Sequence, residues 1–137
     1  MYPNKYIIEM INDAVSDEKI DSKFYSDLSD MLDDEDDKEL LSQMSLDENK
    51  HYNMFKDIYE HITDSEYNDE EPEYIELSDN ISDNLKSAFV GELTAVEKYR
   101  PILFTLEEPL FKNYLYEIIT DEQKHSLKIL FLLNKYK

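Results

Sequence analysis

The chain has 137 residues, a length that suits a single domain over residues 1–137, and it carries a formal net charge of −19 with one glycine, four prolines and no cysteine. The acidic charge excludes nucleic acid and anionic membrane surfaces as partners, because both bind basic patches. The lack of cysteine excludes disulfides, thiolate zinc sites and rubredoxin-type iron centres.

The spacing of apolar residues predicts a first helix from about Lys5 to Leu32 and a second helix that continues to about Ile62. Between them, the acidic turn 33–37 offers aspartates as helix caps and lacks the glycine that a calcium-binding loop requires. The segment 63–76 is polar and contains a proline, so it is predicted to be a connection.

A third helix is predicted where apolar residues recur from Ile81 to Leu106. Thr105 and Glu108 have the spacing of a capping box, and Pro109 suits the first turn of a helix, so a fourth helix is expected to begin there. Because glycine and proline are too few for the turns of a sheet, we predict an all-α fold.

Glutamate or histidine interrupts the apolar stripe of every predicted helix. A single glutamate does so in the first and third helices. A Glu-x-x-His pair, whose members lie one turn apart on the same face, does so in the second and fourth. The interrupting residues are Glu18, Glu48, His51, Glu92, Glu122 and His125.

These residues belong to an internal repeat without gaps, at an offset of 74 residues. The sequence DENKH at 47–51 returns as DEQKH at 121–125, and Tyr25 likewise corresponds to Tyr99. Further identities fall on the apolar positions of the helices. The repeat therefore indicates a duplicated helical hairpin.

In each predicted hairpin, the single glutamate lies level with the Glu-x-x-His pair. The midpoint between Glu18 and Glu48 is residue 33, in the acidic turn, and the midpoint between Glu92 and Glu122 is residue 107. Two hairpins packed about a two-fold axis therefore bring all six side chains together. The second and third helices must then run parallel, with a long crossover between them. A helix of about 27 residues is about 40 Å long, and about 14 extended residues reach about 46–50 Å, so the connection 63–76 is just long enough to run the length of the bundle.

Four carboxylates and two imidazoles buried without partners would each cost several kcal/mol. No lysine or arginine lies on these stripes to pair with them, whereas two divalent cations would neutralise the four glutamates. One glutamate from each of two helices and Glu-x-x-His from the other two is the ligand pattern of di-iron and di-manganese proteins with ferritin-like four-helix bundles. Oxygen and imidazole donors favour iron or manganese, with zinc as an alternative.

The chain resembles rubrerythrin-type proteins of the ferritin-like superfamily over essentially its whole length. The matching features are Glu18 with Tyr25, the motifs at 47–51 and 121–125, and GELTAVEKYRP at 91–101. The paired Glu-x-x-His motifs, each with an upstream glutamate, make the resemblance specific.

This resemblance implies a site with two iron ions, in which Glu48 and Glu122 bridge the two irons. The ligands that would bind one iron each are Glu18, His51, Glu92 and His125. Rubrerythrins usually carry a further glutamate three residues after the ligand of the third helix, where this chain has Ala95. They also often carry a rubredoxin-like domain, for which this chain has no cysteine.

Two tyrosines are candidates for supporting the site. Tyr25 and Tyr99 lie two turns from Glu18 and Glu92, on the same faces of their helices. Each tyrosine either packs in the core or donates a hydrogen bond from its phenol to a ligand carboxylate.

Two aspartates come directly before the Glu-x-x-His pairs. Asp47 and Asp121 are either solvated or accept a hydrogen bond from the ring N–H that does not bind metal. The second arrangement is expected across the hairpins, with Asp121 against His51 and Asp47 against His125.

The resemblance implies an oxidoreductase that reduces hydrogen peroxide or dioxygen by two electrons at a di-iron centre, with an external electron-donor protein. The catalytic glutamates would be Glu18, Glu48, Glu92 and Glu122. We expect a homodimer or small homo-oligomer. The alternatives are a ferritin-like ferroxidase that handles iron and a non-enzymatic, metal-stabilised helical bundle.

The longest apolar run near the C-terminus, ILFLL at 129–133, is too short to cross a bilayer. The N-terminal region lacks the apolar run of a signal peptide. We therefore expect a cytoplasmic protein without a membrane partner.

Overall fold

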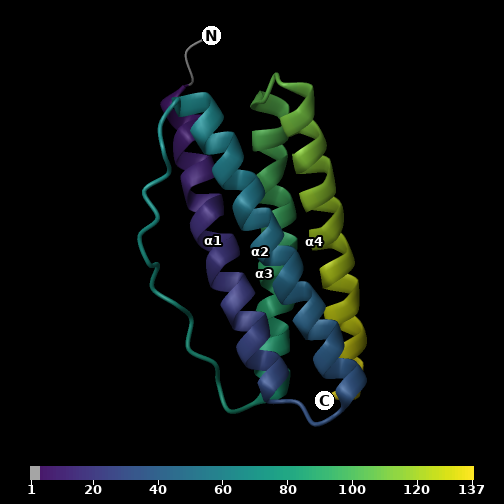
Figure 1. Cartoon of the computed structure of the whole chain (residues 1–137). Helices are drawn as coiled ribbons and strands as arrows, with labels where there is room; N and C mark the ends of the chain where they lie inside the picture. Colours follow the sequence, from purple (N-terminus) through teal and green to yellow (C-terminus); the bar gives the residue numbers. More distant parts are fainter. Residues whose placement is uncertain (1–3) are drawn as a thin grey trace.

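The computed structural model describes residues 4–137, which form four α-helices and no strand (Figure 1). The helices are α1 (Lys5–Asp30), α2 (Glu35–Thr63), α3 (Ile81–Thr105) and α4 (Pro109–Lys135). The all-α prediction is confirmed. The expected bounds differ from the observed ones by one or two residues, as at the end of α1.

Short polar side chains cap the N-termini of the first three helices. The side chain of Asn4 accepts the N–H of Tyr6 at the start of α1. Asp34 caps α2, since its Oδ1 accepts the N–H of Asp37 at 3.0 Å, as the acidic turn predicts. Asn80 caps α3 through a 2.9 Å bond from the N–H of Asp83.

The capping box expected at the start of α4 is wrong, although the start itself was placed correctly. Thr105 is the last residue of α3, and its hydroxyl donates back to the carbonyl of Pro101 at 2.8 Å. Glu108 is the residue before α4 and makes no capping bond through its side chain. Pro109 begins the helix because its fixed φ suits the first turn and its missing N–H would have no partner there.

The helices form a bundle in which each packs against two neighbours. The contacts are between α1 and α2, α3 and α4, α1 and α3, and α2 and α4. Each helix runs antiparallel to the helices that it contacts, so α2 and α3 are parallel and lie diagonally across the bundle (Figure 1). The connection 64–80 runs the length of the bundle, which confirms the predicted ferritin-like arrangement of two hairpins and a long crossover.

An aspartate anchors this crossover to the first hairpin. Asp69 accepts a hydrogen bond from the Tyr52 hydroxyl and lies 3.3 Å from Lys19 Nζ and 3.4 Å from Lys56 Nζ. Both ammonium groups also lie over the Tyr52 ring, at 5.6 and 5.1 Å from its centroid. These contacts hold a segment without secondary structure against α1 and α2.

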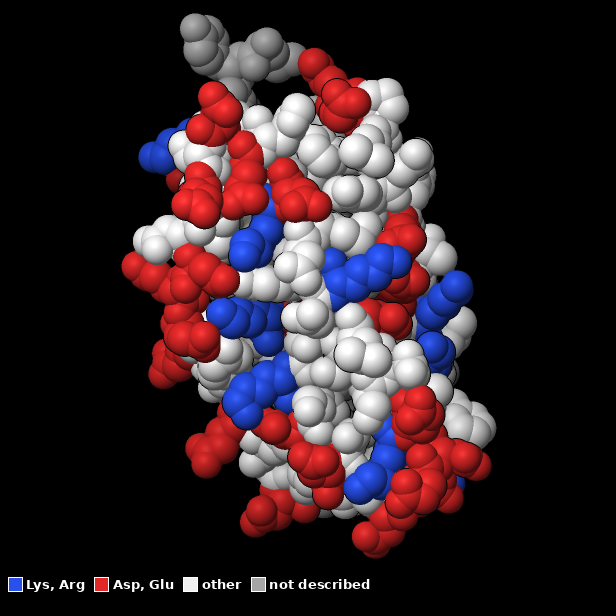
Figure 2. Space-filling model, viewed as in Figure 1, with Lys and Arg blue, Asp and Glu red and all other residues white. Residues whose placement is uncertain are grey.

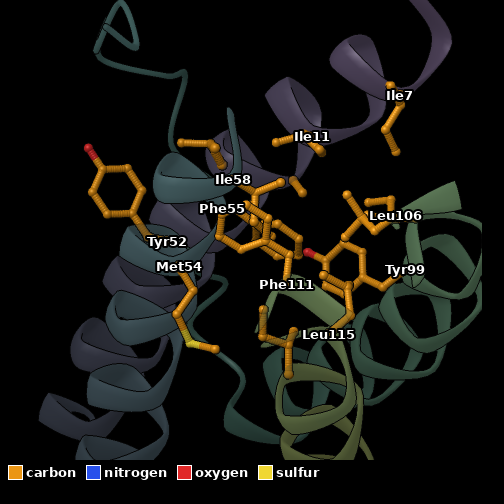
Figure 3. Close-up of a cluster of buried hydrophobic side chains, with 14 of the residues drawn as sticks. Ile7, Ile11, Tyr52, Met54, Phe55, Ile58, Tyr99, Leu106, Phe111 and Leu115 are labelled. Atoms are coloured by element: carbon orange, nitrogen blue, oxygen red, sulfur yellow. The ribbon is translucent and has the colours of Figure 1, made fainter. Parts of the chain in front are cut away.

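Two hydrophobic clusters fill the bundle, one toward each end. The first, the Phe55 cluster, is partly shown in Figure 3. Its buried residues are Ile7, Ile11, Ala14, Val15, Tyr52, Met54, Phe55, Ile58, Ala95, Tyr99, Ile102, Leu106, Phe111, Leu115 and Ile118. The second, the Leu28 cluster, consists of Phe24, Tyr25, Leu28, Leu32, Leu41, Met44, Leu85, Ala88, Ile129 and Leu132. Every helix contributes to both clusters, and the buried residues between them along each helix are polar.

The surface reflects the acidic composition. Figure 2 shows aspartate and glutamate side chains spread over the visible face, with lysine and arginine side chains between them. Among residues 4–137, no helix is long and apolar enough to cross a membrane.

Candidate metal centre

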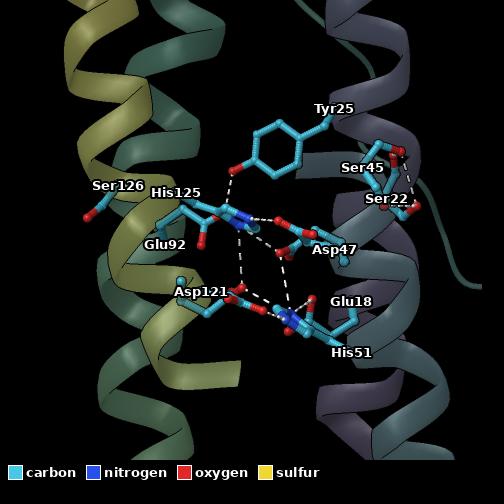
Figure 4. A network of polar contacts seen from close by, with 12 residues as sticks. Glu18, Ser22, Tyr25, Ser45, Asp47, His51, Glu92, Asp121, His125 and Ser126 are labelled. Carbon is cyan, nitrogen blue, oxygen red and sulfur yellow. Dashed lines mark hydrogen bonds and ion pairs between the residues drawn. The ribbon is translucent and has the colours of Figure 1, made fainter. Parts of the chain in front are cut away.

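The six polar residues predicted from the helical stripes meet in the middle of the bundle, between the two hydrophobic clusters. Figure 4 labels four of them, Glu18, His51, Glu92 and His125. Glu92 is 2% exposed, and the other five are completely buried. α1 and α3 each supply one glutamate, whereas α2 and α4 each supply a glutamate and a histidine one turn apart. The repeat thus gives the centre an approximate two-fold arrangement.

Two glutamates lie between the two imidazoles. Glu48 Oε1 is 3.5 Å from His51 Nδ1 and 3.0 Å from His125 Nδ1. Glu122 Oε1 is 3.2 Å from His51 Nδ1 and 3.6 Å from His125 Nδ1. Each of these carboxylates is therefore close to both histidines, as a bridging ligand must be.

The other two glutamates each face one histidine. Glu18 Oε2 lies 3.7 Å from His51 Nδ1, and Glu92 Oε1 lies 3.4 Å from His125 Nδ1. Two groups of four donor residues result, and within each group the donor atoms lie within 4.8 Å of one another. One group is Glu18, Glu48, His51 and Glu122, and the other is Glu48, Glu92, Glu122 and His125.

Most of the side-chain oxygen and nitrogen atoms that face the interior of this centre have no hydrogen-bond partner. Among residues 4–137, eight buried side-chain atoms lack a partner, and all of them belong to these six residues. They are Glu18 Oε2, both oxygens of Glu48, His51 Nδ1, Glu92 Oε2, both oxygens of Glu122, and His125 Nδ1. Orphaned polar atoms in a core are costly, and oxygen and imidazole donors that converge in this way suit two cations such as iron.

The carboxylate pKa values show how strongly the charges interact. Burial and the charge of Glu18 raise the pKa values of Glu48 and Glu122 well above the usual value for glutamate. Burial, the largest single influence, acts to raise the pKa of Glu18, but the contacts with His51, Glu48 and Tyr99 together outweigh it, so that this pKa falls below its usual value. Without metal, Glu48 and Glu122 therefore hold a proton more tightly than an exposed glutamate does.

The imidazoles hold protons more tightly than usual. Burial opposes the charged form of His125, but contacts with Glu92 and Asp47 outweigh burial and raise its pKa to about 8. The same balance, with Asp121 and Glu122 as the leading partners, raises the pKa of His51. In the metal-free protein these protons partly neutralise the carboxylates, a role that bound cations would take over.

Each histidine is oriented by an aspartate from the other hairpin. His51 Nε2 lies 2.8 Å from Asp121 Oδ2, and His125 Nε2 lies 2.8 Å from Asp47 Oδ2. These are the pairs that the sequence predicts. When Nε2–H donates to the aspartate, the neutral imidazole turns the lone pair of Nδ1 toward the carboxylates.

Each tyrosine also crosses to the other hairpin. The Tyr25 hydroxyl donates to Glu92 Oε1 at 2.5 Å, and the Tyr99 hydroxyl donates to Glu18 Oε1 at 2.9 Å. One oxygen of each glutamate is thereby fixed, and the other has no partner. The sequence placed each tyrosine on the same face as the glutamate of its own helix, but it did not show that the bond crosses between α1 and α3.

One residue near the centre was missed by the sequence reasoning. Asp21 follows Glu18 by one turn, and burial together with the charges of Glu18 and Glu92 raises its pKa well above the usual value. Its spacing from Glu18 was a signal that could have identified it, but its position in the repeat corresponds to Ala95.

Comparison with known proteins gives one result that bears on identity. No curated protein matches the chain. The family model described as Rubrerythrin matches residues 2–80, which are more than half of the chain and include Glu18, Glu48 and His51. That family is a ferritin-like di-iron family, in agreement with the four-helix bundle and its buried carboxylate and histidine cluster. The chain therefore belongs to the rubrerythrin family.

Proposed function

We propose that the centre binds two iron ions and that Glu48 and Glu122 bridge them. The observation that carries this proposal is the pair of overlapping donor groups, which share these two glutamates and leave their four carboxylate oxygens without hydrogen bonds. Glu18 and His51 would complete the ligands of one ion, and Glu92 and His125 those of the other. Four glutamates balance the charge of two divalent ions.

The proposed reaction is the two-electron reduction of hydrogen peroxide or dioxygen, with electrons returned by an external donor protein. Bound iron would supply the electrons for this reduction. The chain's own contribution is to hold the ligands in place and to keep water out. Tyr25 and Tyr99 restrain the carboxylates of Glu92 and Glu18, and Asp47 and Asp121 restrain the imidazoles.

Anaerobic titration and rapid mixing test this proposal together. The metal-free protein is expected to bind two Fe²⁺ per chain. The loaded protein is expected to oxidise its iron with hydrogen peroxide at least ten times faster than free Fe²⁺ at the same concentration, as followed by near-ultraviolet absorbance. A rate no faster than that of free Fe²⁺ would overturn the proposed reaction.

The matched control replaces Glu48 and Glu122 together by glutamine, which keeps their shape and removes two charges. Because both glutamates have raised pKa values in the folded protein, the variant should fold and be more stable than the metal-free wild type. It should no longer bind two irons. The exposed Glu117→Gln variant should behave as the wild type does.

A ferritin-like role in iron oxidation and handling is the second candidate, and the net charge of −19 favours it because an acidic surface attracts Fe²⁺. Light scattering after size-exclusion chromatography distinguishes the two. A homodimer or small homo-oligomer supports the oxidoreductase, and a multi-subunit shell supports iron handling.

A further inference from the structure

Two pockets lie on the face between α1 and α3, and the internal repeat relates them. The Asp21 pocket, of about 250 Å³, includes Asp21 and Tyr25 from α1 and Ala88, Gly91 and Glu92 from α3. Ile75 of the crossover also lines it.

The second pocket, the Lys98 pocket, has a volume of about 230 Å³ and is lined by Asp13, Ala14, Lys98 and Tyr99, among others. At the offset of 74 residues, Ala14 and Tyr99 are the counterparts of the alanine and tyrosine of the Asp21 pocket. The two pockets thus have equivalent positions in the two hairpins, and the residues that differ between them can be compared directly.

Of these two pockets, the Asp21 pocket is the one lined by a glutamate of the centre. Glu92 lines it, is 2% exposed, and has a buried Oε2 without a hydrogen-bond partner among the described residues. The corresponding glutamate, Glu18, is not among the residues that line the Lys98 pocket. The Asp21 pocket therefore reaches from the outside of the bundle to a glutamate of the centre, which Figure 4 shows close to His125.

An ion pair joins the helices at the Lys98 pocket and has no counterpart at the Asp21 pocket. Lys98 Nζ lies 2.8 Å from Asp17 Oδ2, which links α3 to α1 next to Glu18. The repeat replaces these two residues by Phe24 and Gly91. A Cβ atom at Gly91 would meet no heavy atom within 4 Å, so space remains open where the ion pair would lie.

The Asp21 pocket also contains a carboxylate that the other pocket lacks. Asp21 corresponds to Ala95 in the repeat, and its side chain is partly buried. Within residues 4–137, no lysine, arginine or histidine forms an ion pair with it. A carboxylate that has no ion-pair partner and lines the same pocket as the ligand glutamate Glu92 has the chemistry to bind a divalent ion in passage.

We propose that the Asp21 pocket is the port through which Fe²⁺ reaches the centre, and that Asp21 binds the ion before Glu92 receives it. The Asp17–Lys98 ion pair keeps the equivalent route at the Lys98 pocket, on the same face, shut. This inference rests on the proposed metal centre, but it concerns the rate of loading and not the ligands that hold the metal afterwards.

Co²⁺ uptake by the metal-free protein tests the proposal without reference to enzyme activity. Absorbance from bound Co²⁺, followed by stopped flow, gives the rate, and titration gives the stoichiometry and affinity. Asp21→Asn and Gly91→Leu, which fills the open space, should each slow uptake about tenfold or more. Both variants should still bind the metal of the wild type at equilibrium.

Asp13→Asn is the matched control, because it removes one carboxylate from the Lys98 pocket and leaves the same net charge as Asp21→Asn. Its uptake rate should stay within about twofold of the wild type. Equal slowing by both variants would show general attraction by charge and overturn the port. An unchanged rate in Asp21→Asn, or a lower stoichiometry, would also overturn it. If the wild type takes up no Co²⁺ or Fe²⁺, the metal centre itself fails, and the port with it.

Discussion

The hydroxyl groups of Tyr25 and Tyr99 each fix one oxygen of a buried glutamate and leave its second oxygen free. A buried carboxylate that lacks this donor would have two unsatisfied oxygens and a freer side chain. Burial and the neighbouring carboxylates raise the pKa values of both phenols well above the usual value, so both remain donors at neutral pH. Each tyrosine therefore acts on the centre through the glutamate of the opposite hairpin.

Replacement of either tyrosine by phenylalanine tests this role. Tyr25→Phe and Tyr99→Phe should each lower the free energy of unfolding by about 1–3 kcal/mol, because a buried charged acceptor loses its donor. Each should also weaken metal binding by about 10- to 100-fold, since the ligand is no longer held in place. Denaturant melts and Co²⁺ titration measure the two effects. Tyr116→Phe, at an exposed position, should change neither, and equal effects of all three variants would contradict the assigned role.

At the scale of the elements, the crossover 64–80 is a segment without secondary structure and without fully buried residues. Asp69 joins it to α1 and α2 through Tyr52, Lys19 and Lys56, and the Tyr52 hydrogen bond is the main cause that lowers the pKa of Asp69. Each ion pair is partly exposed and worth little alone, but the three partners act on one carboxylate.

Asp69→Ala should therefore loosen the crossover without unfolding the helices. Hydrogen exchange is expected to be at least tenfold faster in the crossover and unchanged in the middle of α1 and α2. Asp79→Ala changes an exposed aspartate of the same segment and serves as the control. If exchange is the same in both variants, Asp69 does not anchor the crossover.

The helices and the gathering of the six polar residues could be predicted because the apolar stripe of a buried helix face tolerates few polar residues. The repeat showed that the polar residues on these stripes occupy equivalent positions in the two hairpins. What the sequence could not show depends on contacts between hairpins. Periodicity places Tyr25 on a face of α1 but not against Glu92 of α3. It also gives Thr105 the spacing of a cap, although the chain around Pro101 leaves that hydroxyl bonded within α3. The assignment of the six residues as metal ligands stays a prediction.

For the whole molecule, the centre makes stability depend on pH. In the folded metal-free protein the pKa values of Glu48 and Glu122 are raised, and that of His125 rises from 6.5 to about 8. The folded state therefore binds more protons than the unfolded chain. The stabilisation that these groups provide is fully present below the pKa values of the unfolded chain. It is lost as the pH rises through the raised pKa values of the folded protein. The histidine alone contributes on the order of 2 kcal/mol.

Bound cations reverse this dependence, because they favour ionised carboxylates and neutral imidazoles. At pH 8 the metal-loaded protein should melt at least 10 °C above the metal-free protein, and at pH 5 the difference should narrow. Thermal melts of both forms across this range provide the measurement. Equal melting temperatures at pH 8 would mean that the six residues do not form a buried ligand set.

The polar centre divides the hydrophobic core into the Phe55 cluster, with fifteen buried residues, and the Leu28 cluster, with ten. In the metal-free protein, the four continuous helices and the hydrogen bonds of the centre join these two halves, but crowded carboxylates weaken the join, and we expect two units of unequal strength. Bound metal would join all four helices at one level, and unfolding would then be a single event. Loss of metal should thus replace one cooperative transition with two steps, in which the Leu28 end, with the turn 31–34, opens first. Iron loading would then determine whether the Leu28 end can open while the rest of the bundle stays folded. The protein's resistance to proteolysis would therefore report its metal content.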